Sequence, residues 1–594
     1  MYKPSITSTI ALLLITATAD AELPDGYWGH EQTRPILDTT MRVTLEPDLS
    51  HLSAAEFQAL EELLAAGQVM NTLYERQRHR GATASKATLQ ELHATSGQSV
   101  ETQNLLDLYY LSKGPIATTL DNVRAPILPV ETEQPGKNVY PFGLTKPEID
   151  EFLAAHPEKA AAIIDPRTVV RYSTADNLAT DLAKLDQYPA IDALHDGLRA
   201  QLESEQVSDE LFYAIPYALE YVAELADVRQ HLLAASRLIK PESPDFAAYL
   251  ENRARDLLSG NYESGDASWV SGDFANLNIQ IGSYETYDDA LLGVKAFYSA
   301  SILARDTARS DALIEAMAGL QAIEDSLPYA HSKTVRTRIP VGVYNIIADF
   351  GQARGANTAT ILPNDTNHTR KYGRTILIRY NILGNPVLFA NSKKRFDAVV
   401  DTRYRDHLIS NGKFNRTLWH EVGHYVGVST TADGRSLGEA FADKADLLEE
   451  LKSDLVSLFA AEALHSTGYH DDDGLRAQYA DGVLRTLQTV RPRPEQPYQN
   501  MQLMQFNFFM EMGLLELDGE SGQLVINYDD YHEVVTQMLE QVLQLHYSGD
   551  YEIANQFITR WNYWDELLHG SLATRMRESG IYRRTMVRYH ALGD

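Results

Sequence analysis

The chain has 594 residues, 44% of them hydrophobic, and a mean hydropathy of −0.30, an ordinary composition for a water-soluble globular protein. Its 52 Lys and Arg residues against 82 Asp and Glu residues give a net charge of −30. This charge disfavours nucleic acid as a partner, because phosphate backbones bind clustered cations. The absence of cysteine excludes disulfides, cysteine nucleophiles and thiolate zinc sites, so any metal ion must be bound by His, Asp or Glu.

The N-terminus has the pattern of a secretory signal peptide over residues 1–21. Lys3 precedes an apolar run over residues 10–17, and Ala19-Asp20-Ala21 has the small-x-small form of a cleavage site. The apolar run is shorter than the roughly 20 residues that a membrane helix needs, which favours cleavage over an uncleaved anchor. We therefore expect an exported protein, periplasmic or extracellular, with no stable membrane association after cleavage.

Residues 22–47 are rich in Pro, Thr and Asp without clear periodicity, which predicts an extended leader. Helical spacing begins at Asp48, with Ser53 and Glu56 in the positions of a capping box. Runs of β-branched and aromatic residues predict strands over residues 277–281, 339–349 and 375–383. Helical periodicity then returns from Asn411 to the end.

These patterns predict an α+β fold of two lobes separated by a cleft. Residues 48–335 are expected to form a mixed α/β substrate-binding lobe. Residues 336–594 are expected to form a mostly helical catalytic zinc lobe that includes a central strand segment.

A metal-binding pattern lies at His420-Glu421-Val422-Gly423-His424. In an HExxH helix the two imidazoles lie one turn apart, so both can reach one metal ion. An apolar stripe along the same helix puts the histidines on another face, so the pair need not be buried in the core. The alternative is that they are two ordinary histidines of a helix surface.

A second predicted helix, over residues 438–464, carries carboxylates along one face, at Asp443, Asp446, Glu450 and Asp454. Taken alone, such a stripe is typical of a solvated face. Beside the HExxH helix it supplies what a catalytic zinc needs: a third N/O ligand, an open position for water and a nearby carboxylate that takes the proton. Glu421 is the residue placed for that proton. The combination predicts one catalytic Zn²⁺ per chain and a hydrolase.

From about Asp48 to the C-terminus the sequence resembles the dipeptidyl-peptidase III family of zinc metallopeptidases, in particular a bacterial and plant branch often labelled Nudix-like or zinc-dependent hydrolase. The HExxH segment and Glu449-Glu450-Leu451-Lys452-Ser453-Asp454, which is similar to the family's EExxxD/E motif, carry the resemblance. It implies that His420, His424 and Glu450 bind the zinc. It also implies that Glu449 and Asp454 orient these ligands by hydrogen bonds.

Three distant segments extend the resemblance. Glu285-Thr286-Tyr287 is similar to the family's E-S/T-Y motif, which implies that Tyr287 stabilises the tetrahedral intermediate and that Glu285 holds the amino terminus of the substrate. Asn364, after Pro363, is similar to an asparagine that also binds this terminus. His532 lies where the family has a second catalytic-site histidine. Without this context the four residues would be interpreted as a packing aromatic, a solvated charge, a turn residue and a structural histidine.

Two departures from the family affect these expectations. The HExxH motif here has five residues, whereas better-known members have a six-residue HExxGH-type motif. Ile361 stands where the dipeptidyl peptidases of the family have another asparagine that binds the substrate terminus. Release of dipeptides is therefore less firmly supported than peptidase chemistry.

Together these observations predict a secreted or periplasmic zinc metallopeptidase that hydrolyses short peptides and releases N-terminal dipeptides. Two alternatives stay open: a zinc-dependent hydrolase of a non-peptide bond, and a non-catalytic peptide-binding protein, which the presence of Glu421 disfavours. A Nudix-type diphosphate hydrolase is disfavoured because its sequence box needs a glutamate six residues after the first glycine, where Ala440 follows Gly434. The net charge suggests a preference for encounter with cationic peptides.

Overall fold

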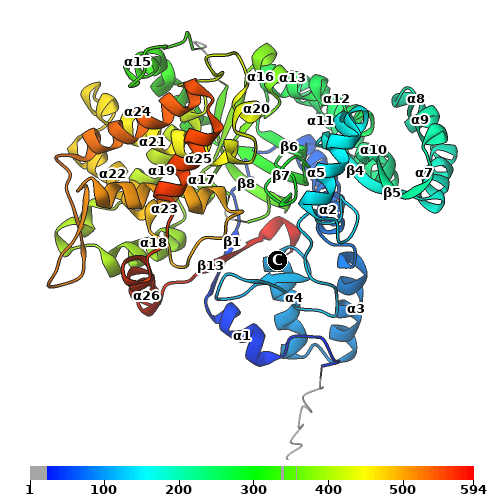
Figure 1. Ribbon diagram of the computed structural model, residues 1–594, viewed down its shortest axis with the longest axis horizontal. Helices are drawn as coiled ribbons and strands as arrows, with labels where there is room; N and C mark the ends of the chain where they lie inside the picture. The colour runs from blue at the N-terminus through cyan, green and yellow to red at the C-terminus, as the bar shows by residue number, and fades with distance from the viewer. Residues whose placement is uncertain (1–22, 336–339, 356, 594) are drawn as a thin grey trace, which may run out of the picture.

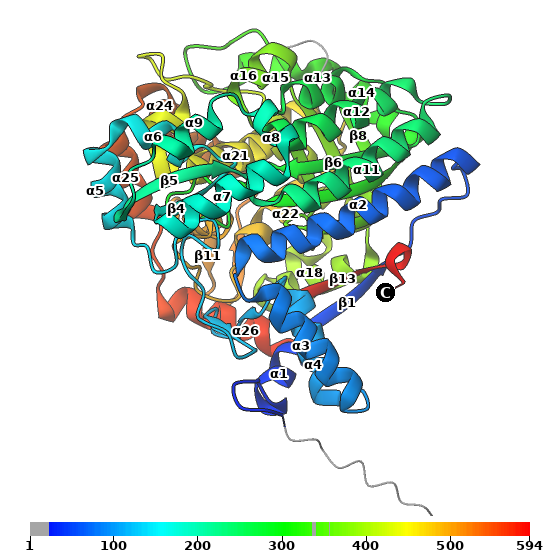
Figure 2. The same ribbon diagram turned by 90° about the vertical axis from the view of Figure 1, so that its right-hand side faces the viewer.

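The computed structural model describes residues 23–335, 340–355 and 357–593. The predicted signal peptide lies outside these residues. One five-stranded sheet lies between two groups of helices (Figures 1 and 2), so the predicted α+β class is confirmed. Within the described part, no helix is both long and apolar enough to cross a membrane.

The central sheet contains all three predicted strand segments. β10 runs parallel to β8, and the other neighbouring strands are antiparallel. The last predicted segment is a strand only to Arg379, because residues 380–383 form a helical turn. In spatial order the strands are β6 (Leu277–Ser283), β7 (Tyr298–Arg305), β8 (Val341–Gly351), β10 (Thr375–Arg379) and β9 (Ala359–Leu362).

This sheet separates two hydrophobic cores. Leu377 packs into the N-terminal core, whereas its neighbours Ile376 and Ile378 pack into the C-terminal core. Successive side chains of a strand point to opposite faces, so one strand contributes to both cores. The predicted domain boundary after residue 335 falls within the sequence of this sheet, since β6 and β7 precede it and the other three strands follow it. The boundary stays a prediction.

Long helices cover the N-terminal face of the sheet. α2 (Ala54–Arg78) begins with the predicted capping box of Ser53 and Glu56 and crosses the sheet (Figure 2). A Cβ at Gly67 would overlap the ring of Phe350 in β8, so this glycine lets α2 approach the sheet closely. The other helices of this core are α5 (Lys146–Ala155), α6 (Pro157–Ile164), α7 (Ala175–Gln187), α8 (Pro189–Leu194), α9 (Leu198–Ser204), α10 (Tyr217–Glu220), α11 (Val222–Ile239), α12 (Pro244–Ser259) and α13 (Glu263–Ser271). Helices α3 (Ala82–Thr95) and α4 (Val100–Ser112) form a separate small apolar cluster, whereas α14 (Thr307–Ala316) and α15 (Leu320–Ser326) pack into the C-terminal core. Two antiparallel strand pairs accompany them, β2 (Ile116–Thr118) with β3 (Arg124–Pro126) and β4 (Thr168–Ser173) with β5 (Ser208–Pro216).

The predicted extended leader over residues 22–47 is wrong for most of its length. His30–Asp38 forms helix α1, and Thr40–Leu45 forms strand β1. β1 pairs in parallel with β13 (Arg584–Tyr589), close to the C-terminus (Figure 1). This partner lies more than 500 residues away, so local periodicity could not reveal the strand.

The C-terminal core is built from helices, as predicted. α19 (Ser410–Gly423) lies against both α21 (Ala445–Ser466) and α22 (Asp472–Thr486). The other elements are α16 (Thr366–Tyr372), α17 (Tyr380–Leu383), α18 (Pro386–Val399), α20 (Leu437–Phe441), α23 (Pro497–Glu511), α24 (Tyr531–Ser548), α25 (Tyr551–Trp561), α26 (Ser571–Glu578) and the short pair β11 (Leu515–Leu517) and β12 (Leu524–Ile526).

A glycine inside the HExxH segment permits the close packing of α19 on α21. A Cβ at Gly423 would lie 2.8 Å from both the Cα and the carbonyl oxygen of Ser453. These are backbone atoms, which cannot rotate away as a flexible side chain could. Any side chain at Gly423 would therefore push the two helices apart.

Replacing Gly423 by alanine is expected to lower the free energy of unfolding by about 1–3 kcal/mol, because overpacking a tight core forces backbone shifts. Gly438→Ala is the matched control, since Gly438 is also helical but has open space around it. Chemical denaturation of both variants measures the difference. Equal unfolding free energies would contradict the proposed backbone constraint.

Candidate active site

His420, Glu421 and His424 lie at the C-terminal end of α19. His424 is the C-cap residue and still has helical backbone angles, so the one-turn spacing of the two imidazoles is kept. His420 is 5% exposed and Glu421 is 7% exposed. His420 is buried and His424 is partly buried, because α21 and α22 cover the helix that carries them, so the two are not ordinary histidines of an open helix surface.

Glu450 on α21 completes a group of three ligand atoms. Its Oε2 lies 3.1 Å from Nε2 of His420 and 3.9 Å from Nε2 of His424. One donor atom from each of the three residues lies within 4.8 Å of the other two. Two imidazole nitrogens and a carboxylate oxygen at this spacing can hold one divalent metal ion, with room for a further ligand.

The acidic face of the second helix is not simply a solvated face. Glu450 and Asp454 are buried, whereas Asp443 and Asp446 are exposed. A buried carboxylate is unfavourable unless it is hydrogen-bonded, paired or bound to a metal. The interpretation as a solvated stripe therefore holds only for the N-terminal part of this face.

Two further carboxylates orient the histidines. Nδ1 of His420 lies 2.9 Å from Asp454, and Nδ1 of His424 lies 2.9 Å from Glu449. An Nδ1–H donated to a carboxylate leaves Nε2 free to bind a metal and makes it a stronger ligand. The predicted orienting roles of Glu449 and Asp454 match this geometry.

Two arginines and His420 keep the carboxylate of Asp454 in its charged form. Asp454 accepts from Arg485 at 2.8 Å and lies 3.3 Å from Arg416. Burial alone would raise the pKa of Asp454, but Arg485 and His420 hold it well below its usual range. Burial would also lower the pKa of His420, but hydrogen bonds to Asp454 and Glu450 raise it to about 9.

Glu421 lies close enough to His420, His424 and Glu450 to be influenced by their charges, but it is not one of the three residues of the metal-ligand group. Burial is the largest influence on its carboxyl group and raises the pKa of Glu421 above its usual value, and the negative charge of Glu450 adds to this effect. A carboxylate with a raised pKa beside a metal site is suited to accept a proton and return it.

Tyr498 connects the metal-ligand group to Tyr287, a role that no sequence pattern indicates. Its hydroxyl donates to Oε1 of Glu450 at 2.8 Å and lies 3.3 Å from the hydroxyl of Tyr287. The two rings meet edge to face, with centroids 5.9 Å apart. Tyr498 is one of 32 tyrosines and follows the helix-starting Pro497, so no spacing signal separates it from the others.

Glu285 and Asn364 are brought together from different strands. Glu285 follows β6, Asn364 follows β9, and Nδ2 of Asn364 donates to Oε2 of Glu285 at 3.1 Å. Burial, followed by the charges of Glu450 and Asp446, raises the pKa of Glu285 to about 7. The structure thus unites two residues that the resemblance assigned to the substrate terminus.

His532 makes no hydrogen bond or ion pair with this group among the described residues, and its catalytic role stays a prediction. Its ring stacks on Phe459 with centroids 5.0 Å apart, and its Nδ1 lies 4.0 Å from Glu462. Phe459 follows Glu450 by nine residues on α21, which is about 13 Å along a helix. The sequence around His532 matches the family only loosely. The residue that lies beside Glu450 is Tyr498.

Comparisons with known proteins support the fold. No protein-family model matches the sequence. The structure of DPP III from Caldithrix abyssi aligns with a TM-score of 0.76 and 21% identity, covering 94% of this chain and 99% of that chain. The structure of dipeptidyl-peptidase III from Corallococcus sp. strain EGB aligns with a TM-score of 0.79 and 22% identity, covering 96% and 98%. The chain has the dipeptidyl-peptidase III fold.

The sequence resemblance to this group is therefore confirmed at the level of the fold. Among curated proteins, "Nudix hydrolase 3" of Arabidopsis thaliana is 23% identical over 560 residues, covering 87% of this chain and 69% of that protein. The two solved structures, at 21% and 22% identity, show the fold alone, and the chemistry depends on the side chains described above.

Tyr498→Phe is expected to weaken metal binding by about tenfold or more, because it removes the hydroxyl that orients the third ligand, Glu450. Tyr551→Phe is the control: Tyr551 also donates to a carboxylate, that of Asp443, but it lies on the exposed surface of α25. Competition with a chromophoric chelator measures the dissociation constants. Identical constants for both variants would show that Tyr498 does not orient Glu450.

Proposed function

We propose that this protein is a zinc metallopeptidase that hydrolyses short peptides and releases N-terminal dipeptides. The observation that carries this proposal is the convergence of His420, His424 and Glu450, with the carboxyl group of Glu421 adjacent. A fold shared with two solved structures named as dipeptidyl-peptidase III supports it.

Zinc fits the donor set. Neutral imidazole and carboxylate suit Zn²⁺, and a structural zinc would use a fourth protein ligand, commonly a thiolate, which a chain without cysteine cannot supply. When bound here, the ion would supply a Lewis acid that polarises the scissile carbonyl and acidifies water.

Three residues near the metal ligands have separate roles in the proposed reaction. Glu421 accepts a proton from the attacking water and returns it to the leaving amine. The hydroxyl of Tyr287, which is 41% exposed and so accessible to a substrate, donates a hydrogen bond to the carbonyl oxygen as negative charge develops there. Tyr498 holds Glu450 and Tyr287 in register with each other.

The amino terminus of the peptide sets the position of cleavage. Glu285 pairs with the ammonium group, and the side-chain oxygen of Asn364 accepts a second hydrogen bond. Ile361, buried in β9, offers no polar atom for this purpose, so Glu285 and Asn364 carry the recognition. Anchoring the terminus at a constant distance from the ligands leads to release of a fragment of constant length, here a dipeptide.

The alternatives from the sequence have less support. A diphosphate hydrolase would use glutamates of a Nudix box to bind Mg²⁺, and this chain lacks that box despite its similarity to a protein named Nudix hydrolase 3. A peptide-binding protein would need neither Glu421 nor the tyrosine pair. Export to the periplasm or medium, supported by the pattern of residues 1–21, is part of our proposal.

The proposal is tested by cleavage of a mixed oligopeptide pool by the zinc-loaded protein and its Glu421→Gln variant, with mass spectrometry of the products and zinc stoichiometry for both. We expect one zinc in each and loss of N-terminal dipeptides with the native protein, reduced at least about 10³-fold in the variant. One zinc without cleavage in either protein would refute the peptidase.

The pH dependence gives an independent test of Glu285. Since burial raises its pKa to about 7, its carboxylate is lost as the pH falls below 7, and kcat/KM is expected to fall over the same range through a rise in KM. Glu285→Gln is expected to lower kcat/KM at least about tenfold and to remove this part of the pH profile. Glu552→Gln, at an exposed carboxylate of α25, serves as the control. A native pH profile retained in Glu285→Gln would contradict the assignment.

A further inference from the structure

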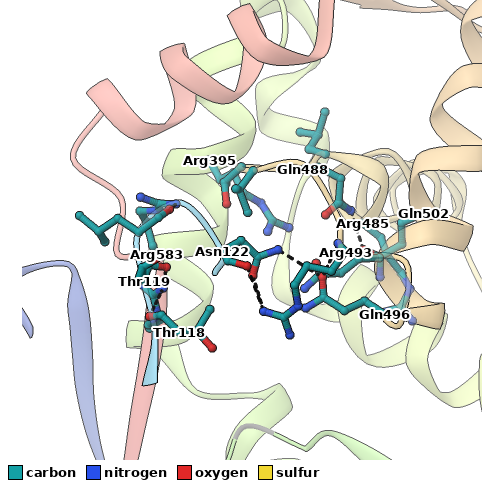
Figure 3. Close-up of a pocket in the computed structure, with 16 residues that line it drawn as sticks. Thr118, Thr119, Asn122, Arg395, Arg485, Gln488, Arg493, Gln496, Gln502 and Arg583 are labelled. Atoms are coloured by element: carbon teal, nitrogen blue, oxygen red, sulfur yellow. Dashed lines mark hydrogen bonds between the residues drawn. The ribbon is translucent and has the colours of Figure 1, made fainter. Parts of the chain in front are cut away.

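An arginine-lined pocket lies beside the proposed active site. It has a volume of about 470 Å³ and lies between the β2–β3 hairpin, α18, α22, α23 and the start of β13 (Figure 3). Its lining includes Arg395, Arg485, Arg493, Arg583 and Arg584 and contains no Asp or Glu. In a chain with a net charge of −30, this pocket has the opposite sign to the protein as a whole.

Three of these arginines lack a counter-ion. Within the described residues, Arg395, Arg583 and Arg584 make no ion pair within 4.0 Å, and they donate to backbone carbonyls of Leu484, of Leu120, and of Thr118 and Thr119 respectively. A carbonyl satisfies a donor but does not neutralise its charge. Nε of Arg395 and one terminal nitrogen of Arg584 are buried without any hydrogen-bond partner. The unmet donors and uncompensated charge make this pocket a site for anions.

Among the residues that the structure describes, nearby carboxylates neutralise only two of the five arginines that line the pocket, since Glu495 pairs with Arg493 and Asp454 pairs with Arg485. Asp481 pairs with Arg416, and Asp454 pairs with Arg485 on the side of the metal ligands. Asp121, on the hairpin near Arg583, is exposed and is not part of the lining. Burial, and then repulsion by Arg583, lowers the pKa of Arg584 to about 10, which is consistent with a cluster of like charges.

The pocket adjoins the metal-ligand group. Arg485 donates to Asp454, which in turn contacts His420. On α23, Tyr498 turns its hydroxyl to Glu450 and Tyr287, and Gln499 and Gln502, in the same helical turn, line the pocket. Arg485 and α23 thus connect the pocket to the metal-ligand group, and a peptide that extends beyond these ligands toward α23 would approach it.

We propose that the arginine pocket binds the carboxylates of the leaving part of the peptide, so that the protein selects short peptides with an acidic C-terminal part. This inference rests on the proposed peptidase function and adds the substrate class to it. The three unpaired guanidinium groups can accommodate the terminal carboxylate and one or two acidic side chains. The preference for cationic peptides suggested by the net charge applies at most to the encounter, because the local charge of the pocket decides binding.

Peptide binding without hydrolysis tests this directly. Calorimetry on the zinc-loaded Glu421→Gln variant compares Ala-Ala-Ala-Glu-Glu with Ala-Ala-Ala-Gln-Gln, and we expect at least about tenfold tighter binding of the acidic peptide. Adding Arg583→Gln is expected to remove about fivefold to tenfold of this selectivity, and Arg583→Lys, which keeps the charge, to retain most of it. Arg560→Gln is the control, since Arg560 is an exposed arginine of α25.

Equal binding of the two peptides, or unchanged selectivity in Arg583→Gln, would overturn the proposal. So would inorganic phosphate alone binding as tightly as the acidic peptide, because the pocket would then be a site for free anions. The result is separable from the peptidase assignment. Selective binding combined with no cleavage by the native protein would support the pocket and refute the peptidase.

Discussion

The proposed metal centre depends on the close approach of α19 and α21. Gly423 touches the backbone of Ser453, and Nζ of Lys452 donates to the carbonyl oxygens of Gly423 and Val426 at 2.6 and 3.1 Å. These contacts fix the end of α19 against the middle of α21. Only at this separation do two imidazoles on one helix reach a carboxylate on the other.

Several buried charged side chains surround this helix contact, and each is paired with a charge of opposite sign. Asp454 contacts His420 on one side and Arg416 and Arg485 on the other, so each charge has a partner. Such networks add little net stability compared with an apolar core, but they hold their members in one orientation. Arg485 also lines the arginine pocket, so it connects this network of ion pairs to the proposed anion site.

The central sheet holds the proposed substrate-binding residues close to the proposed metal ligands. Glu285 and Asn364 follow two of its strands, while the metal ligands come from the helices packed on its C-terminal face. Arg379 is fully buried in β10, where it donates to Thr360 and lies 3.3 Å from Gln280. Negative charges that include Glu421 and Glu285 offset the desolvation of this arginine, whose pKa burial lowers. The sheet thus sets the distance between the proposed peptide anchor and the proposed catalytic residues.

The sequence by itself determined the features that depend on local spacing. The one-turn spacing of His420 and His424, the acidic helix face with Glu450, the capping box at Ser53 and three of the five strands of the central sheet follow from periods of two or about four residues. The family resemblance added Glu285 and Asn364, which the structure joins by a hydrogen bond.

Only the tertiary structure decided which distant residues meet. It placed Tyr498 beside Glu450 and His532 against Phe459, paired residues 40–45 with the C-terminal strand, and buried His420 under neighbouring helices. It also gathered arginines from four separate segments into one pocket. Local periodicity reports which face of an element is apolar, but the partner of that face is chosen by packing between segments hundreds of residues apart.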